Sequence, residues 1–382
     1  MSEYQYYEFQ AVDRPLTAGE QQELRALSTR ARITAKSFVN SYEWGDFKGD
    51  PSRLVERVFD LHLYLANWGS RRFFLRLPKK LVDRIRLNGI LSEVDCVETR
   101  IVGEHLIVEI ARDELEVEDF DDGAGRLAAL APLRANILAG DLRMFYLLWL
   151  TAVEADVFVE DALEPLPGIG PLDGALEAFA EFFQVDADLV SAAAERNAEA
   201  SSGELHRRDI DAAIRALSDK ERMGFLSRLY DGDPLVGAEL RRRVRESVAE
   251  RTRVEPLKAR TVGELRARAA ELAAARKLAA EAAARAERER REAEAAEARK
   301  KRLAAVAARG ELAWREVDNE IERRNAAGYD RATALLADLR DVAASQGRTN
   351  EFERRVDALR QKHARKGQFM DRLRSLAKSS AP

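Results

Sequence analysis

The chain of 382 residues is 46% hydrophobic and 34% charged, which is enough apolar material for two or three domains with real cores. No apolar run approaches the length of a membrane span. The single cysteine, Cys96, excludes an internal disulfide, and with no signal-peptide pattern at the N-terminus it predicts a reducing, cytoplasmic setting. The net charge of −4 is uneven, because residues 1–255 are acidic and residues 256–382 are basic.

Residues 1–115 predict an α+β domain, with helices on a mixed or antiparallel sheet. Alternating polar and apolar residues favour strands, and the last two are expected to form a hairpin that turns at Gly103. The predicted strands are 4–12, 37–44, 71–77, 94–102 and 105–111.

Two longer helices are expected between these strands. One begins at the capping box of Thr17 and Glu20. The other begins at Asp50-Pro51 and runs to about Asn67. The second prediction rests on the helical spacing of Leu54, Val58, Leu61 and Leu65, and it places His62 on this helix as a partly buried packing residue.

An acidic connector, DELEVEDFDD over residues 113–122, joins this domain to a helical region over residues 124–255. The connector lacks the residue pattern of a calcium loop, so it is interpreted as a solvated linker and no metal site is predicted. In the helical region, an antiparallel helix pair is predicted around Gly140-Asp141, and the loop PLPGIGP over residues 165–171 follows it. Further helices are predicted after the loop at 172–183, 187–196, 208–217, 219–229 and 235–250.

Residues 261–309 predict one long helix that begins at a capping box of Thr261 and Glu264. Its length at 1.5 Å per residue is about 70 Å. Between Leu278 and Leu303 no aliphatic residue exceeds alanine in size, which disfavours a hydrophobic coiled-coil seam. A solitary solvated strut, an alanine-lined coiled coil that could self-associate, and disorder are the three alternatives. Opposite charges one turn apart favour the strut, namely Glu281–Arg285, Glu287–Arg291, Arg290–Glu294 and Glu297–Lys301.

Residues 311–380 predict a C-terminal helical unit. Trp314, Val317 and Ile321 share one helical face, and a helix over residues 329–344 is expected to stop at Gly347. A capping box of Asn350 and Glu353 is expected to begin the next helix. Two antiparallel helices joined by a short glycine turn are similar to one unit of a tetratricopeptide-type repeat.

Two stretches resemble known families. The opening YQYYEFQAVDRPLTAGEQQELRALSTRARIT resembles the start of a family of bacterial proteins of unassigned function. The end, YDRATALLADLRDVAASQGRTNEFERRVDALRQKHARKGQFMDRL, resembles a helical unit of bacterial reading frames, some of them associated with SWIM-type zinc fingers. A SWIM finger needs three cysteines and a histidine, and this chain has only Cys96, so the resemblance implies no zinc site.

No catalytic constellation is predicted. The four histidines, His62, His105, His206 and His363, lie far apart and match no metal motif, and no phosphate-binding glycine loop or nucleophile elbow occurs. Neither a cofactor nor a catalytic residue is therefore assigned.

A loop at the sheet edge is the candidate binding site, because aromatic and charged residues gather there among flexible glycines, although a plain turn with a helix cap is the simpler interpretation. Its residues are Trp44, Asp46, Phe47, Lys48 and Asp50, joined at the same end of the sheet by Trp68, Arg71 and Arg72.

Basic residues in the last third are candidate phosphate contacts, although acids alternate with them along the helix. They are Arg299, Lys300, Lys301, Arg302, Arg365 and Lys366. The function that we expect from the sequence is a non-enzymatic cytoplasmic adaptor or scaffold, whose long helix spaces a globular head from a helical unit that binds a protein partner. The alternative is association with nucleic acid through the basic C-terminal region.

Overall fold

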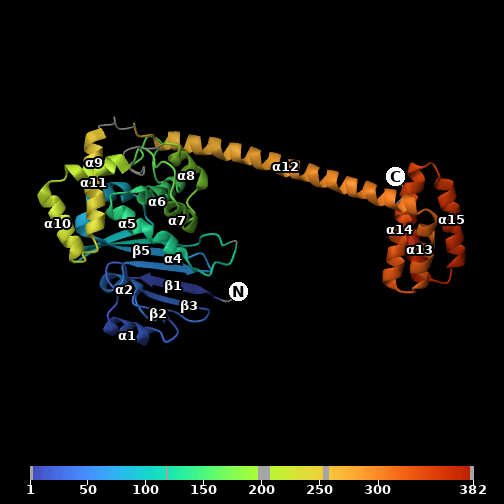
Figure 1. Ribbon diagram of the computed structural model, residues 1–382, viewed down its shortest axis with the longest axis horizontal. Helices are drawn as coiled ribbons and strands as arrows, with labels where there is room; N and C mark the ends of the chain where they lie inside the picture. Colours follow the sequence, from blue (N-terminus) through green and yellow to red (C-terminus); the bar gives the residue numbers. More distant parts are fainter. Residues whose placement is uncertain (1–2, 118, 197–206, 253–257, 379–382) are drawn as a thin grey trace. The chain divides into compact units, whose positions relative to one another are not determined.

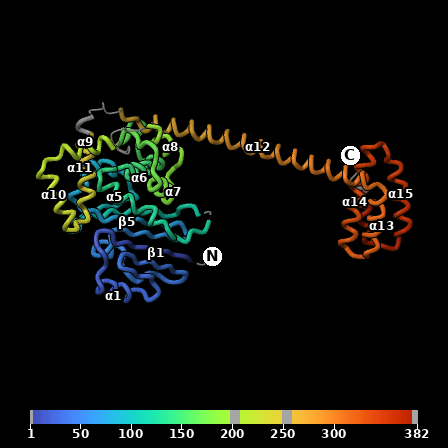
Figure 2. Tube along the Cα trace, in the orientation of Figure 1, coloured from blue at the N-terminus to red at the C-terminus, as the bar shows by residue number. Residues whose placement is uncertain are grey.

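The computed structural model describes residues 3–117, 119–196, 207–252 and 258–378. The chain divides into two compact units, Met1–Arg276 and Lys277–Pro382 (Figures 1 and 2). The predicted fold class is confirmed, since a sheet with helices comes first, followed by an all-helical region that contains a long helix. The domain boundaries that we drew inside these units stay predictions, and those at residues 255 and 380 lie outside the described residues, as does His206.

Seven strands of the described chain form one antiparallel sheet in the order β2-β3-β1-β4-β5-β7-β6. The hairpin of β6 and β7 turns at Gly103 as predicted. The strands are β1 Gln5–Gln10, β2 Arg32–Ile33, β3 Ser37–Tyr42, β4 Leu61–Ala66, β5 Arg71–Pro78, β6 Val97–Val102 and β7 His105–Arg112.

The helix predicted from Pro51 to Asn67 is wrong in its second half. Helix α2 ends at Arg57, and Leu61–Ala66 form strand β4, which pairs with β1 on one edge and with β5 on the other. Both faces of β4 are covered, so nearly every position is apolar and the leucines also satisfy helical spacing. His62 therefore lies on a central strand and is 1% exposed, which is more deeply buried than we predicted.

Helices cover both faces of the sheet (Figure 1). On one face, α1 and α2 pack through Leu24 and Val55 against the phenylalanine-rich side of the sheet. On the other face, helices α3 to α8 pack against Leu63 and Phe73. The elements on the two faces are α1 Ala18–Leu27, α2 Pro51–Arg57, η1 Lys79–Leu81, α3 Arg84–Leu91, α4 Arg126–Leu130, α5 Pro132–Leu138, α6 Arg143–Glu154, α7 Gly174–Phe182 and α8 Ala187–Ala194.

Three further helices follow in unit 1, and they fall where the apolar periodicity predicts them. They are α9 Arg207–Ala216, α10 Asp219–Tyr230 and α11 Val236–Thr252. Helix α11 contacts α5, α9 and α10, and it is the main neighbour of α10.

The predicted long helix is helix α12, Val262–Arg309. The capping box is confirmed, because Thr261 N donates to Glu264 Oε2 at 2.9 Å and Glu264 N donates to Thr261 Oγ1 at 3.1 Å. Val262 and Leu265 belong to the core of unit 1, and Val306 belongs to the core of unit 2. Each end of α12 is therefore built into one hydrophobic core.

Between residues 274 and 302 every side chain of α12 is exposed except that of Glu287, which is half-buried. The pairs Glu287–Arg291 and Arg290–Glu294 form as predicted, at 2.8 and 3.7 Å. The other two predicted pairs are wrong in their partners, because a neighbour on the same helix face lies closer. The observed pairs are Arg285 with Glu289 at 3.0 Å and Glu297 with Lys300 at 3.9 Å.

Unit 2 packs four helices and the end of α12 around Val317, Ile321, Leu336 and Phe369. The capping box predicted at Asn350 does not form. Helix α15 begins earlier, after Arg348, so the backbone of Asn350 is already helical and cannot take the extended conformation of an N-cap. The helices are α13 Glu311–Glu322, α14 Ala326–Ser345, α15 Thr349–Lys362 and α16 Gly367–Lys378.

Candidate functional site

The two segments of the candidate binding loop lie at one end of the sheet. In the register of the sheet, Gln5 of β1 stands between Tyr42 of β3 and Ala66 of β4. The loop after Tyr42 and the turn after Ala66 therefore emerge side by side. Gln5 also contacts the loop directly, since its Nε2 donates to Asp46 Oδ1 at 2.9 Å.

The residues of the loop take different roles. Phe47 is a core residue, with its ring centroid 5.2 Å from that of Tyr7. Asp50 caps α2 by accepting from Arg53 N at 3.2 Å, as the simpler interpretation expects. Trp44 is 78% exposed, and Lys48 is exposed as well. Trp44, Asp46 and Lys48 are thus the exposed residues of the candidate loop that neither enter the core nor cap a helix.

Trp68, Arg71 and Arg72 do not converge on that loop as one surface. Trp68 donates its indole N–H to Ser70 Oγ at 3.0 Å. Arg72 makes a two-bond pair with Asp113, at 3.0 and 2.9 Å, whereas Arg71 donates to Phe182 O of α7 at 2.8 Å. Because neighbours on a strand point to opposite faces, Arg71 and Arg72 lie on opposite sides of the sheet.

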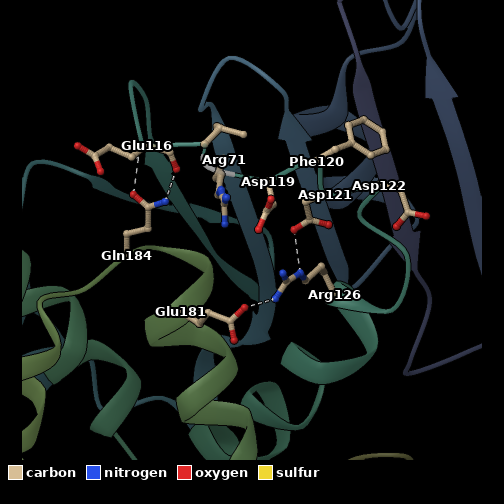
Figure 3. Close-up of a pocket in the computed structure, with 10 residues that line it drawn as sticks. Arg71, Glu116, Asp119, Phe120, Asp121, Asp122, Arg126, Glu181 and Gln184 are labelled. Carbon is tan, nitrogen blue, oxygen red and sulfur yellow. Dashed lines mark hydrogen bonds and ion pairs between the residues drawn. The ribbon is translucent and has the colours of Figure 1, made fainter. Parts of the chain in front are cut away.

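Arg71 lies in a hollow of about 770 Å³ between the acidic connector, α4 and α7 (Figure 3). The sequence shows the acidic connector but not the hollow, because Glu181 and Gln184 come to line the hollow only in the folded chain. The lining residues are Arg71, Glu116, Val117, Asp119, Phe120, Asp121, Asp122, Arg126, Glu181 and Gln184.

The side chains of the connector are mostly exposed, as we predicted for a solvated linker. Its backbone nevertheless contacts the sheet domain closely at both ends. Leu115 N donates to Gly69 O at 3.1 Å, and a Cβ on Gly69 would stand 2.2 Å from Leu115 O. At the other end, a Cβ on Gly123 would stand 2.4 Å from the ring of Tyr6. Both glycines have positive φ, so their lack of a side chain allows the close approach.

The hollow is acidic. Its described lining holds five carboxylates against two guanidinium groups. Figure 3 shows Arg126 between Asp121 and Glu181, at 2.9 and 2.7 Å. Among the described residues Arg71 makes no ion pair, and burial lowers the pKa of its guanidinium. The excess of carboxylates would attract a cationic group.

In the part of the chain that the structure describes, no group of three or more histidine, cysteine or acidic side chains is placed to hold a metal ion. Cys96 is partly buried, with Sγ 3.6 Å from Thr151 Oγ1, and burial raises the pKa of its thiol. His62 and His363 are both buried, and they lie in different units.

Most of the candidate phosphate contacts already pair with acids of unit 2. Arg299 lies 2.6 Å from Asp341, Arg302 lies 2.8 Å from Asp338, and Lys366 lies 2.8 Å from Glu322. Lys300 has the long contact with Glu297 given above. Among the described residues Lys301 and Arg365 are exposed and make no ion pair. A phosphate would have to displace carboxylates from three of the six cations at close contact, and the site stays a prediction.

Within the described ranges no helix combines the length and the apolar character needed to cross a membrane. Comparison with known proteins leaves both family resemblances as predictions, because no family model, no curated protein and no solved structure matches this chain.

Proposed function

We propose that this protein is a non-enzymatic adaptor, in which unit 1 and unit 2 each bind a protein partner and α12 sets the spacing between the two binding events. The proposal takes the cytoplasm as its setting, in keeping with the single, partly buried thiol of Cys96.

The observation that carries the proposal is the construction of α12. Its first turns belong to one hydrophobic core and its last turns to another, while the segment between them is exposed. Buried Arg260 fixes the entry to the helix, with Nη2 3.0 Å from Glu164 Oε2 and Nη1 2.7 Å from Ala192 O. A helix anchored at both ends, with ion pairs instead of an apolar seam between them, supports a linking role better than a packing role.

The test is sequential affinity capture from cells with two variants of the full chain. In one variant, residues 279–298 are replaced by a glycine-serine sequence of equal length. In the matched control, the same residues are shuffled so that composition and helix propensity are kept. Cross-linking with mass spectrometry identifies which protein contacts which unit.

We expect the natural chain and the shuffled control to recover two proteins together, one cross-linked to each unit. The glycine-serine variant should recover each protein singly and lose most of the joint complex, because a flexible segment no longer fixes the distance. Recovery of proteins on only one unit, or equal joint recovery by all three chains, would contradict the adaptor role.

The nucleic-acid alternative predicts a different result. Recovery would then depend on nucleic acid in the lysate and would be lost after nuclease treatment. Filter binding of the full chain to duplex DNA would also weaken steeply as salt rises. The close carboxylate partners of Arg299, Arg302 and Lys366 argue against this outcome.

A further inference from the structure

Helix α10 presents an apolar face that no described part of the chain covers. Leu226, Leu229 and Tyr230 lie three, six and seven residues after Met223, so the four side chains fall on one side of the helix. Their exposed fractions run from 58% at Leu226 to 92% at Tyr230, and none of the helix's residues is buried. Figure 1 shows α10 at the outside of unit 1.

The opposite side of α10 is held by polar contacts, which turn the apolar face outward. Arg228 lies 2.7 Å from Asp233 and also pairs with Glu239 of α11, and Glu221 lies 3.4 Å from Arg243 of α11. A helix of this length is marginal in water unless it packs on something. Contiguous exposed apolar side chains of this kind mark a contact surface.

We propose that this face binds a second copy of the chain, with the two α10 helices packed antiparallel across a twofold axis. In that arrangement Met223 of one copy faces Tyr230 of the partner subunit, and Leu226 lies near the axis against its own equivalent. The same apolar patch then serves both subunits, as an isologous contact requires.

The charges at the two ends of α10 select the antiparallel direction. Lys220 lies at the start of the helix, and Asp231 lies directly after its end. Both are exposed, and neither forms an ion pair with a described residue. On a helical wheel they flank the apolar face on the same side. Antiparallel packing therefore brings Lys220 next to Asp231 of the partner subunit, twice by symmetry, whereas parallel packing would place the two residues on opposite flanks of the contact, where they cannot pair.

The size of the face sets the expected strength. Four side chains on one short helix make a smaller contact than the roughly 800 Å² per partner of a standard interface. We therefore expect a dimer that dissociates more readily than one with a standard interface.

Sedimentation equilibrium of the full chain at increasing micromolar concentrations tests the proposal. The natural chain should shift from monomer to dimer. The double variant Leu226→Glu with Tyr230→Glu should remain a monomer throughout, because it places charge in the centre of the contact. The matched control Ile85→Glu changes another exposed residue of unit 1, which is 88% exposed on α3, and should dimerise as the natural chain does. Circular dichroism verifies that each variant is folded.

A charge exchange then tests the direction of packing. Lys220→Asp alone should raise the dissociation constant several-fold, and combining it with Asp231→Lys should restore the natural value. The proposal fails if the natural chain is monomeric at every concentration. It also fails if a dimer forms but ignores the Leu226 and Tyr230 changes, which would assign association to another surface such as α12. If the exchange restores nothing, antiparallel packing is refuted.

Discussion

His62 is buried in the sheet without full hydrogen bonding. Its Nδ1 lies 3.0 Å from Glu8 O, its ring stacks 3.9 Å from that of Phe9, and among the described residues its Nε2 has no partner. Burial lowers the pKa of this imidazole to about 3, since the charged form would lose its water and gain no acceptor. The side chain is therefore neutral in the folded protein at every ordinary pH.

This burial makes stability depend on pH. The unfolded chain binds a proton at His62 near pH 6.5, whereas the folded protein binds it only near pH 3. Protonation in that window favours the unfolded state, so the free energy of unfolding should fall by about 1.4 kcal/mol for each pH unit below 6.5.

In the variant His62→Leu, the free energy of unfolding should depend less steeply on pH, by the contribution of one proton. Urea unfolding between pH 7 and pH 5 measures this slope. His105→Gln is the control and should change the slope less, because that ring is only half-buried. Parallel curves for His62→Leu and the natural chain would refute the assignment.

Asp60 is a second buried residue whose role the sequence did not reveal. It accepts from Val12 N at 2.6 Å and Asp13 N at 2.9 Å, and it lies 2.8 Å from Arg76 and 3.7 Å from Arg134. Burial alone would raise the pKa of its carboxyl, but the two guanidinium charges and the backbone donors hold that pKa below its usual value. This cluster joins α5 to β5 and to the segment after β1.

The variant Asp60→Asn should lower the free energy of unfolding by about 3–5 kcal/mol, because it leaves the buried guanidinium of Arg76 without its carboxylate partner, whereas Arg134 keeps its pair with Asp13 at 2.7 Å. Asp50→Asn is the matched control. It makes the same substitution at the exposed N-cap of α2, where asparagine caps equally well, and should be nearly neutral. Equal losses for the two variants in urea unfolding would show that the cluster contributes no more than a surface carboxylate.

At the scale of elements, local signals predicted part of what local contacts determine, although the capping box expected at Asn350 does not form. The capping boxes at Thr17 and Thr261 depend only on residues within one turn, and both form. Strand β4 could not be predicted this way, because LHLYLA fits a helix as well as a strand until β1 and β5 pair with it on both sides. The hollow around Arg71 could not be predicted for the same reason, because Glu181 of α7 and Arg126 are far apart in the sequence and meet only in the folded chain. The sequence predicted that the two segments of the candidate loop lie at the same end of the sheet, and they do. Which of their side chains remain exposed could not be predicted, because Phe47 is buried in the core.

The acidic connector depends on Gly69 for its path. Gly69→Ala would combine a φ of +89° with a Cβ placed 2.2 Å from Leu115 O, whereas Gly45→Ala has a φ of +81° with open space around it. We expect Gly45→Ala to cost about 1–2 kcal/mol from backbone strain. Gly69→Ala should cost about 1–3 kcal/mol more, because the connector must move. Hydrogen exchange should rise over residues 113–117 in Gly69→Ala alone. Similar exchange in both variants would mean that the contact with Leu115 does not hold the connector.

At the scale of the molecule, the two units have separate cores. Phe73 belongs to a cluster made only of unit 1 residues, and Phe369 belongs to a cluster made only of unit 2 residues. Between the two cores, the exposed segment of α12 is held only by the local hydrogen bonds of a helix, which join residues four apart. No apolar side chains of this segment link one core to the other. Cooperativity of unfolding follows shared buried surface, so it should stop within each unit.

Calorimetry of the full chain should therefore show two unfolding transitions that respond to different substitutions. Phe369→Ala removes a fully buried ring from unit 2 and should lower the stability of that unit by about 3–5 kcal/mol, and it should leave the other transition in place. Phe73→Ala is the reciprocal control and should lower only the transition of unit 1. If either variant moves both transitions together, α12 couples the units energetically. The chain would then behave as one folding body, and an adaptor made of two independent ends would lose its physical basis.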